Sequence, residues 1–233
     1  MQRRSETLAK ISIFRSLNDS VVANLDTQCS WRRFSKNEWI LTYQDEGDDV
    51  FFIVSGLVQV RIQAISGRET LLREVAAGEY FGELAALDGG PRSSGVVAVT
   101  DTIIARMPAK VFRSVILCNP DLCDQLLRHF ASQIRVLANR VNEYSTLDMR
   151  ERLYAELLRL ARPDRMDGNR GLITPPPLHA DLAAKISTRR EAVTRELKSM
   201  ERSGLVERRR GGIVLADISN LRHLLDEELD EAL

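Results

Sequence analysis

Hydrophobic and polar positions divide the chain into a β-rich segment and a helical segment. Between Trp31 and Met107 short apolar runs are separated by turn residues, with glycines at 47, 56, 67 and 78. The predicted strands span Trp31–Phe34, Trp39–Thr42, Val50–Val54, Leu57–Ile65, Thr70–Val75, Gly95–Val99 and Ile103–Met107. Such regularly spaced short strands are typical of an antiparallel sandwich or jelly roll. The first thirty residues are amphipathic and are predicted to be helical.

One long helix is predicted after Asn119 and Pro120, because no glycine occurs again before Gly168. Its apolar residues recur at alternating steps of three and four, which is the spacing of a coiled-coil seam. The seam residues are Leu127, Phe130, Ile134, Leu137, Val141 and Tyr144. This pattern predicts a homodimer, although burial of the same face against the helix's own domain also fits the spacing.

The C-terminal third predicts a winged helix-turn-helix. A helix over Asp148–Ala161 is followed by a turn-rich connector. Two further helices are predicted at about 180–185 and 189–202, separated by the short turn Ile186-Ser187. Val206–Val214, with Gly211-Gly212 at its apex, is predicted to form the hairpin of the wing.

Composition excludes several classes of protein. The chain has 233 residues, of which 44% are hydrophobic and 28% charged, so it is neither disordered nor collagen-like. Its apolar runs, such as Val50–Val54, are too short to cross a bilayer, and the charged stretch Met1–Lys10 shows no export signal. Cys29, Cys118 and Cys123 form no CxxC pair, which fits a reducing compartment. We therefore expect a cytoplasmic protein with no membrane partner.

Charge is distributed unevenly although the formal net charge is zero. Residues 178–212 hold nine basic and five acidic side chains, whereas residues 226–231 hold five acidic side chains and no basic one. A basic segment of this kind is suited to an anionic polymer.

The segment Tyr80–Ala85, followed by Arg92-Ser93-Ser94, combines residues that suit a phosphorylated sugar. Gly82 allows backbone amides to approach a ligand, Glu83 can accept hydrogen bonds from sugar hydroxyls, and Arg92 can pair with a phosphate. The alternative from spacing alone is a surface ion pair between Glu83 and Arg92.

This segment resembles the phosphate-binding cassette of the CRP/FNR family of transcription regulators, Phe-Gly-Glu-Leu-Ala followed by Arg-Ser-Ala. The matching residues are Gly82, Glu83, Leu84, Ala85, Arg92 and Ser93. The resemblance implies that Glu83 holds the ribose 2′-hydroxyl, while Arg92, Ser93 and nearby backbone amides hold the cyclic phosphate. Ser94 and Ala86 depart from the usual alanine and larger aliphatic residue.

The resemblance extends along the chain in the same order and implies an α+β protein. It assigns residues 1–118 to a cyclic-nucleotide-binding β jelly roll with an N-terminal helix, 119–145 to a dimerisation helix, and 146–233 to a winged helix-turn-helix domain. The segment Asn142–Asp148 is expected to act as the hinge. DNA, RNA polymerase and a second copy of the chain are the partners that the family implies.

The nucleobase contact is less defined. Leu137 and Ala138 stand where cyclic-AMP-binding members have two hydroxyl residues, and Asn139 and Asn142 nearby offer amides that suit adenine or guanine. We expect cyclic AMP to be favoured, with cyclic GMP as a second ligand. Polar residues are also common on the exposed faces of coiled coils, and Leu137 offers only an apolar contact.

The segment Ser187–Arg195 resembles the start of the family's recognition helix. Thr188 and Glu191 have the spacing of a capping box. The residues predicted to contact DNA are Arg189, Arg190, Glu191, Thr194 and Arg195. Arginine pairs with guanine and glutamate with cytosine, so the outward face suits a palindromic TGTGA-type operator. Arg189 and the wing arginines 208–210 are expected to contact phosphates. The alternative is an exposed face stabilised by pairs such as Glu191 with Arg195.

The chain lacks the residues that other kinds of sensor and jelly-roll enzymes require. An iron–sulfur sensor needs about four clustered cysteines, and only Cys29 precedes the β-domain. Residues 31–107 contain no histidine, which argues against a metal-dependent jelly-roll enzyme, and His129 is expected to be a solvated helix residue rather than a haem ligand. We expect no enzyme activity, no metal, no haem and no cluster. A DNA-binding regulator that acts constitutively, with a vestigial or differently tuned pocket, remains the alternative function.

Overall fold

The computed structural model describes residues 6–63, 69–163 and 167–231. The chain divides into two compact units, Met1–Gln133 and Ile134–Leu233, and helix α4 (Pro120–Thr146) runs across their boundary. Each unit has its own sheet structure and its own buried core, as separate domains do. No helix of the described residues is both long enough and apolar enough to cross a bilayer.

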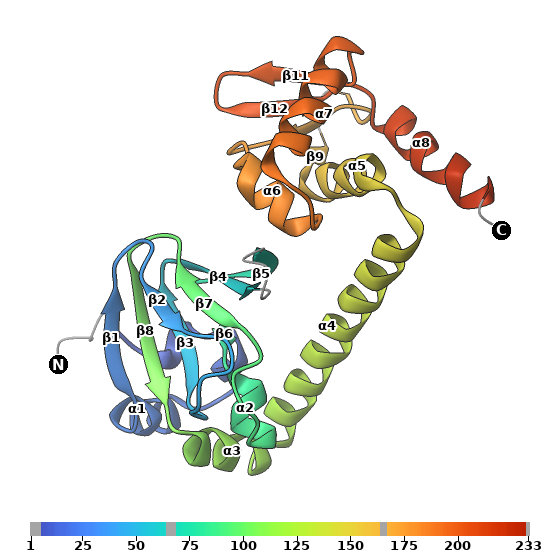
Figure 1. Ribbon diagram of the computed structural model, residues 1–233. Coiled ribbons are helices and arrows are strands. Elements are labelled where there is room, and N and C mark those ends of the chain that lie inside the picture. The colour runs from blue at the N-terminus through green and yellow to red at the C-terminus, as the bar shows by residue number, and fades with distance from the viewer. Residues whose placement is uncertain (1–5, 64–68, 164–166, 232–233) are drawn as a thin grey trace. The chain divides into compact units, whose positions relative to one another are not determined.

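The N-terminal unit begins with helical turns that precede two four-stranded sheets (Figure 1). Its helical elements are the 3-10 helices η1 (Leu8–Lys10) and η2 (Ser12–Phe14), and the α-helices α1 (Asp19–Thr27), α2 (Glu83–Asp88) and α3 (Ala109–Leu117). Its strands are β1 (Ser30–Phe34), β2 (Trp39–Leu41), β3 (Val50–Ser55), β4 (Leu57–Gln63), β5 (Glu69–Ala76), β6 (Tyr80–Phe81), β7 (Gly95–Ala98) and β8 (Thr102–Met107). The sheets have the orders β1-β8-β3-β6 and β2-β7-β4-β5, and every neighbouring pair is antiparallel.

Strand β3 is apolar at consecutive positions because both of its faces are covered. Phe51 and Ile53 belong to one core cluster with Val96 of β7, so they fill the space between the two sheets. Val50 and Phe52 point to the opposite face and belong to a second cluster, built with residues of η1, η2, α1, α3 and the start of α4. The residue alternation of a strand thus supplies both cores from one element.

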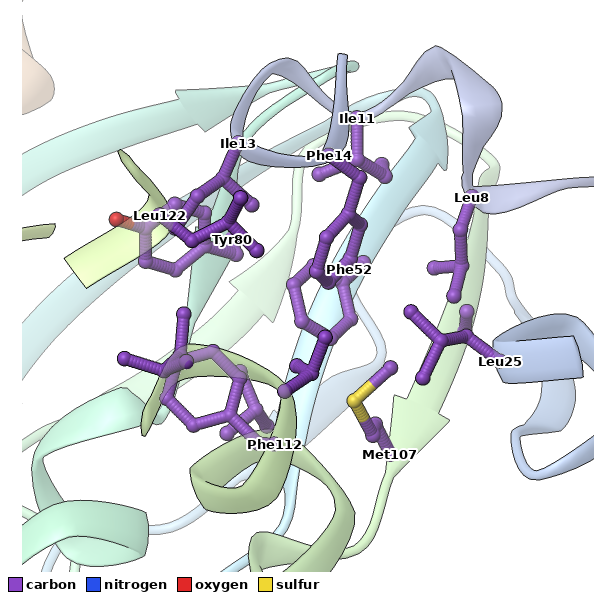
Figure 2. Packing of buried hydrophobic residues seen from close by; sticks show 14 of the residues in the cluster. Leu8, Ile11, Ile13, Phe14, Leu25, Phe52, Tyr80, Met107, Phe112 and Leu122 are labelled. Atoms are coloured by element: carbon purple, nitrogen blue, oxygen red, sulfur yellow. The ribbon is translucent and has the colours of Figure 1, made fainter. Parts of the chain in front are cut away.

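Phe52 is the centre of the second cluster (Figure 2). Its ring centroid lies 5.0 Å from that of Phe14, 6.0 Å from that of Tyr80 and 6.2 Å from that of Phe112. These partners come from η2, β6 and α3. This single aromatic side chain therefore packs the sheet against one helical element that precedes the strands in the sequence and one that follows them.

The C-terminal unit contains the end of α4, four further helices and one antiparallel sheet. The helices are α5 (Met149–Leu160), α6 (His179–Lys185), α7 (Arg190–Arg202) and α8 (Ile218–Glu231). The strands are β9 (Arg162–Pro163), β10 (Gly171–Ile173), β11 (Val206–Arg209) and β12 (Gly212–Leu215), in the order β11-β12-β10-β9. Asp148 caps α5 in a capping box with Glu151, and α5, α6 and α7 contribute Leu153, Leu182 and Val193 to the core.

The predicted elements are largely confirmed, with small shifts at their ends. Positions 64–65 of the predicted strand 57–65, and Gly67, lie outside the described residues. The helical prediction for the first thirty residues is confirmed in part, because their described portion contains η1, η2 and α1 separated by short irregular segments rather than one continuous helix. The sequence did not predict β6, α2, β9 and β10, since elements of two to six residues are too short to show a periodicity.

Replacing Phe52 by alanine should lower the free energy of unfolding of the N-terminal unit by about 3–5 kcal/mol, because removing a fully buried aromatic ring leaves a cavity. The measurement is urea unfolding followed by tryptophan fluorescence, since both tryptophans, Trp31 and Trp39, lie in this unit. Leu117→Ala is the control, because the Leu117 side chain is 72% exposed. A loss for Phe52→Ala no larger than that of the control would contradict this account of the core.

Candidate functional site

The turn between β6 and α2 depends on Gly82. Its φ is +81°, in the left-handed region that favours glycine, and Glu83 begins α2 directly after it. A Cβ atom at this position would lie 2.9 Å from Nη1 of Arg92 and 3.1 Å from the carbonyl oxygen of Asp49. The glycine therefore allows both the turn and the close approach of Arg92.

Arg92 is the buried cation of this turn. It is 3% exposed, its Nη1 donates a hydrogen bond of 3.0 Å to the carbonyl oxygen of Gly82, and its Nε has no hydrogen-bond partner among the described residues. The guanidinium lies 5.4 Å from the ring centroid of Phe51, which stacks on Phe81 at 5.2 Å. This cation–π contact and the single hydrogen bond hold the guanidinium in place and leave the buried Nε–H group without a partner among the described residues.

Burial lowers the pKa of Arg92, and the carboxylates of Asp49 and Asp48 oppose that shift. Asp49 accepts a hydrogen bond of 2.7 Å from Nε of Arg106, so its negative charge is already shared with a second arginine. An anion placed at Arg92 would therefore meet a desolvated cation, where electrostatic attraction is stronger than at the protein surface.

Glu83 is the second charged residue of the turn and is 7% exposed. Glu83 and Arg92 form no ion pair with each other in the described part of the chain, and both are buried. The alternative of a surface ion pair is therefore wrong. Ala85 is also buried, whereas Leu84 and Ser93 are exposed, so the cassette presents both buried charges and accessible side chains.

His129 lies on α4 against this part of the sheet, and the expectation of a solvated histidine is wrong. Its ring centroid lies 5.4 Å from that of Tyr80, and its Nε2 is buried without a hydrogen-bond partner among the described residues. Burial and the charge of Arg73 lower the pKa of His129, whereas Glu83 and Glu79 oppose the shift. A periodicity search marks only apolar positions, so it could not have placed a histidine on the inner face of this helix.

The seam residues of α4 differ in what covers them. Leu127 is 61% exposed, Ile134 65% and Val141 64%, and Leu137 is also exposed. Phe130 is only partly buried and packs against the core cluster of the N-terminal unit. Four of the six predicted seam residues therefore form an apolar row that nothing within the described chain covers.

The candidate nucleobase residues are all exposed on α4. Leu137, Ala138, Asn139 and Asn142 belong to the C-terminal unit, whereas the cassette residues belong to the N-terminal unit. Their side chains are accessible to a ligand, and the two groups of residues lie on different units of the chain.

Helix α7 presents most of the predicted DNA-contact residues to solvent. Arg189, Arg190, Glu191 and Arg195 are exposed, while Val193 is fully buried on the inner face. Glu191 and Arg195 form no ion pair with each other in the described part of the chain. The alternative in which this pair stabilises the helix face therefore lacks its main contact.

Thr194 is only partly exposed, and its hydroxyl makes local contacts. It donates to the carbonyl oxygen of Arg190 at 2.9 Å and lies 2.8 Å from Nδ1 of His179, the first residue of α6. The Thr194 hydroxyl therefore contacts both the α7 backbone and the imidazole of His179. Burial and the charges of Arg208 and Arg190 lower the pKa of His179, while Glu201 opposes the shift.

The predicted capping box of Thr188 and Glu191 is wrong. The N-cap of α7 is Arg189, and no side chain caps it. The reason is the preceding turn, in which Ser187 has a φ of +55° and the Thr188 N–H donates to the carbonyl oxygen of Ala183 at 2.9 Å. This is a Schellman motif that ends α6, so Thr188 completes the earlier helix instead of starting the next one.

No cluster of three or more histidine, cysteine, aspartate or glutamate side chains suited to a metal ion occurs in the described ranges. The residues that sequence reasoning missed are Phe51 and Asp49. Phe51 stands in an apolar run that predicts a strand, and Asp49 stands in a loop, so neither carried a signal of its own.

Two family models match the chain. The cyclic nucleotide-binding domain matches residues 31–118, and the Crp-like helix-turn-helix domain matches residues 151–224. The first range contains the Gly82 turn and Arg92, and the second contains α6, α7 and the β11–β12 hairpin.

Curated relatives cover most of the chain. It is 28% identical over 217 residues to the CRP-like cAMP-activated global transcriptional regulator of Mycobacterium tuberculosis, covering 93% of this chain and 97% of that protein. It is 29% identical over 185 residues to the cAMP-activated global transcriptional regulator CRP of Escherichia coli O157:H7, covering 77% and 86%. The relatives are transcription regulators, which confirms the prediction that the chain is not an enzyme.

Solved structures share the fold. A CRP/FNR-family transcriptional regulator from Thermus thermophilus has a TM-score of 0.62 and 26% identity, covering 84% of this chain and 98% of that one. A variant of CooA from Carboxydothermus hydrogenoformans has a TM-score of 0.78 at 19% identity, covering 93% and 95%. The predicted α+β architecture is thereby confirmed.

Replacing Gly82 by alanine should destabilise the N-terminal unit more than replacing Gly89. Both glycines have positive φ, which costs an L-residue about 1 kcal/mol, but only at Gly82 would the new Cβ meet Arg92, whereas at Gly89 it meets nothing within 4 Å. Urea unfolding of both variants, followed by tryptophan fluorescence, gives the comparison. Equal losses of stability would mean that Gly82 is needed for backbone conformation alone.

Proposed function

We propose that this chain, which belongs to the CRP/FNR family of transcription regulators, is a homodimeric DNA-binding regulator controlled by a cyclic nucleotide. The family models supply the coarse function, and the finer steps rest on the geometry of Arg92, α4 and α7. We retain the division into residues 1–118, 119–145 and 146–233 as part of this proposal. A regulator of this kind acts on DNA in the cytoplasm and contacts RNA polymerase.

The observation that carries the proposal is the buried guanidinium of Arg92, whose Nε lacks a partner among the described residues. A cyclic phosphate has one negative charge and oxygen acceptors that would satisfy this N–H. Gly82 keeps the space beside Arg92 free of a Cβ, and Glu83 stands at the start of α2 to accept hydrogen bonds from a ribose hydroxyl. Ser93 and the backbone amides of this turn complete the set that would hold the sugar and phosphate.

We propose cyclic AMP as the favoured ligand and cyclic GMP as a second one. Two relatives that cover most of this chain are named as cAMP-activated regulators, which supports the first choice. The exposed amides of Asn139 and Asn142, with the exposed side chains of Leu137 and Ala138, are the groups that would meet the purine. An amide can donate and accept, so it suits either base.

Dimerisation through α4 is supported by the uncovered apolar row. Leu127, Ile134, Leu137 and Val141 recur at the coiled-coil spacing and expose half or more of their side-chain surface. Pairing with the same row of a second copy would remove this surface from water and would place two copies of α7 for a palindromic operator.

DNA recognition is assigned to the exposed face of α7. Arg190 and Arg195 are suited to guanine and Glu191 to cytosine, which fits a TGTGA-type half-site. Arg189, the exposed N-cap residue, and the wing arginines are suited to phosphates. Thr194 is bonded to His179 and Arg190, so we assign it to the orientation of this face.

Control by the nucleotide follows from differential binding. The ligand favours the DNA-competent arrangement only by binding it more tightly, and operator DNA must then tighten nucleotide binding by the same factor. A constitutive regulator with a vestigial pocket would show no such coupling.

Cyclic AMP should strengthen binding to a TGTGA-N6-TCACA duplex at fixed salt, and Arg92→Ala should remove that effect. Loss of one partner of a buried charge pair costs about 2–5 kcal/mol, so the nucleotide affinity should fall by roughly 30-fold or more. The measurement is fluorescence anisotropy of labelled operator without nucleotide, with cyclic AMP and with cyclic GMP. Arg128→Ala, which removes an arginine from an exposed pair on α4, is the matched control.

Equal operator affinity in all three conditions, with the wild-type chain folded, would reject nucleotide control and favour the constitutive alternative. A random duplex of the same length reports the contribution of phosphate contacts, which is strongly salt-dependent.

Ile134→Glu combined with Val141→Glu should convert the dimer to a monomer at micromolar concentration, because two charges would be buried at the seam. Analytical ultracentrifugation gives the mass. Ser132→Glu, at an exposed position outside the seam, is the control and should leave the mass unchanged. A wild-type chain that sediments as a monomer would contradict the assignment of the seam.

A further inference from the structure

At the turn before α7, the backbone carbonyl oxygens of Lys185 and Ile186 accept no hydrogen bond from the helix that they end. Helix α6 ends in the Schellman motif at Ser187, which uses the carbonyl of Ala183, while the carbonyl of Leu182 accepts from the Ile186 N–H at 3.0 Å. The carbonyl oxygens of Lys185 and Ile186 stand at the end of α6, where no N–H group of the same helix donates a hydrogen bond to them.

Side chains from outside α6 supply both partners. The Tyr144 hydroxyl donates to the carbonyl oxygen of Lys185 at 2.8 Å, and Nε of Arg152 donates to the carbonyl oxygen of Ile186 at 3.2 Å. Tyr144 lies in the last turn of α4, and Arg152 lies in the first turns of α5. The positive charge of Arg152 also suits the C-terminal end of a helix.

Arg152 joins the two donors into one group. Its Nη1 donates to the carbonyl oxygen of Leu147 at 2.8 Å, and its guanidinium lies 5.6 Å from the ring centroid of Tyr144. One side chain therefore contacts the end of α4, the junction between α4 and α5, and the turn before α7.

A chain of ion pairs follows the same path. Arg159 of α5 donates to both carboxylate oxygens of Glu143 on α4, at 2.7 and 3.1 Å, and its Nε donates to Glu156 at 3.1 Å. Glu156 is buried and also pairs with the Lys185 ammonium at 3.3 Å. Because Glu143 and Tyr144 are adjacent, the last turn of α4 is tied to the end of α6 by two independent sets of contacts.

We propose that Tyr144 and Arg152 are positioning residues that join the last turn of α4 to the helix-turn-helix as one rigid body. This inference rests on the proposed role of α7 in reading DNA. Any displacement of the end of α4 is then passed directly to the turn that sets the direction of α7. The sequence predicts the segment Asn142–Asp148 as the hinge. The contacts of Glu143, Tyr144 and Arg152 fix this segment to the helix-turn-helix from Glu143 onward. Any bend between the nucleotide-binding unit and the DNA-binding unit therefore lies N-terminal to Glu143 in α4.

The first test measures the distance between the last turn of α4 and the end of α7, and it requires neither nucleotide nor DNA binding. Spin labels at Ser145→Cys and Ser203→Cys, both exposed, are placed on the full chain with Cys29, Cys118 and Cys123 replaced by serine. Labelled chain is mixed with excess unlabelled chain so that pulsed electron resonance reports distances within one protomer. We expect a single narrow distance, and a distribution at least twice as broad after Tyr144→Phe combined with Arg152→Gln.

The second test measures the functional effect of the Tyr144 hydroxyl. Tyr144→Phe keeps the ring and loses one hydrogen bond, so operator affinity at saturating cyclic AMP should fall about fivefold. Cyclic AMP affinity without DNA should not change, and the melting temperature should fall by no more than the few degrees expected for the loss of one hydrogen bond, which separates positioning from global unfolding. Tyr43→Phe, in the N-terminal unit, is the matched control and should leave operator affinity unchanged.

The outcomes separate this inference from the proposed function. An unchanged distance distribution in the double variant, or an unchanged operator affinity in Tyr144→Phe, overturns the inference. If the wild-type chain does not respond to cyclic AMP, nucleotide control fails. Broadened distances and equally weakened operator binding with and without nucleotide would then still support the positioning role of Tyr144 and Arg152.

Discussion

A guanidinium withdrawn from water has to be held by protein groups, and the N-terminal unit is organised to meet that requirement at Arg92. The Gly82 carbonyl, the Phe51 ring and the nearby carboxylates of Asp49 and Asp48 surround the charge, but they leave its Nε without a partner among the described residues. Strand β3 makes this possible because Phe51 faces the space between the sheets while Phe52 anchors the helical side. A stable core therefore surrounds a buried guanidinium whose Nε–H group has no hydrogen-bond partner among the described residues.

The two units are stabilised by different kinds of contact. The N-terminal unit buries its apolar surface on both faces of one sheet, while α4 keeps an apolar row that no described part of the chain covers. In the C-terminal unit the polar ends of short helices set the constraint, since the carbonyls of Lys185 and Ile186 are satisfied by Tyr144 and Arg152. The same contacts that complete α6 connect it to α4, so a local backbone requirement provides a mechanical connection.

Sequence patterns predicted the strands, α4 and the helix-turn-helix because each has a clear periodicity or a clear break. They failed where a local conformation decided the outcome. Ser187 adopts a positive φ that glycine usually provides, so the turn before α7 was placed correctly while its capping was assigned to Thr188 in error. The cassette residues were found through a motif, yet the burial of Arg92 and the stacking of Phe51 depend on strands brought together from distant parts of the chain, which periodicity does not encode.

We propose that the N-terminal unit holds one cyclic nucleotide through the buried cation of Arg92. Isothermal titration calorimetry of the full chain with cyclic AMP, and separately with 5′-AMP, tests it most directly. A cyclic phosphate has one negative charge, whereas the open monoester approaches two at neutral pH and would leave charge unpaired beside Arg92. The account predicts saturable binding of one cyclic AMP per chain and much weaker binding of 5′-AMP. Absence of saturable binding by cyclic AMP and by cyclic GMP to the folded chain would contradict it.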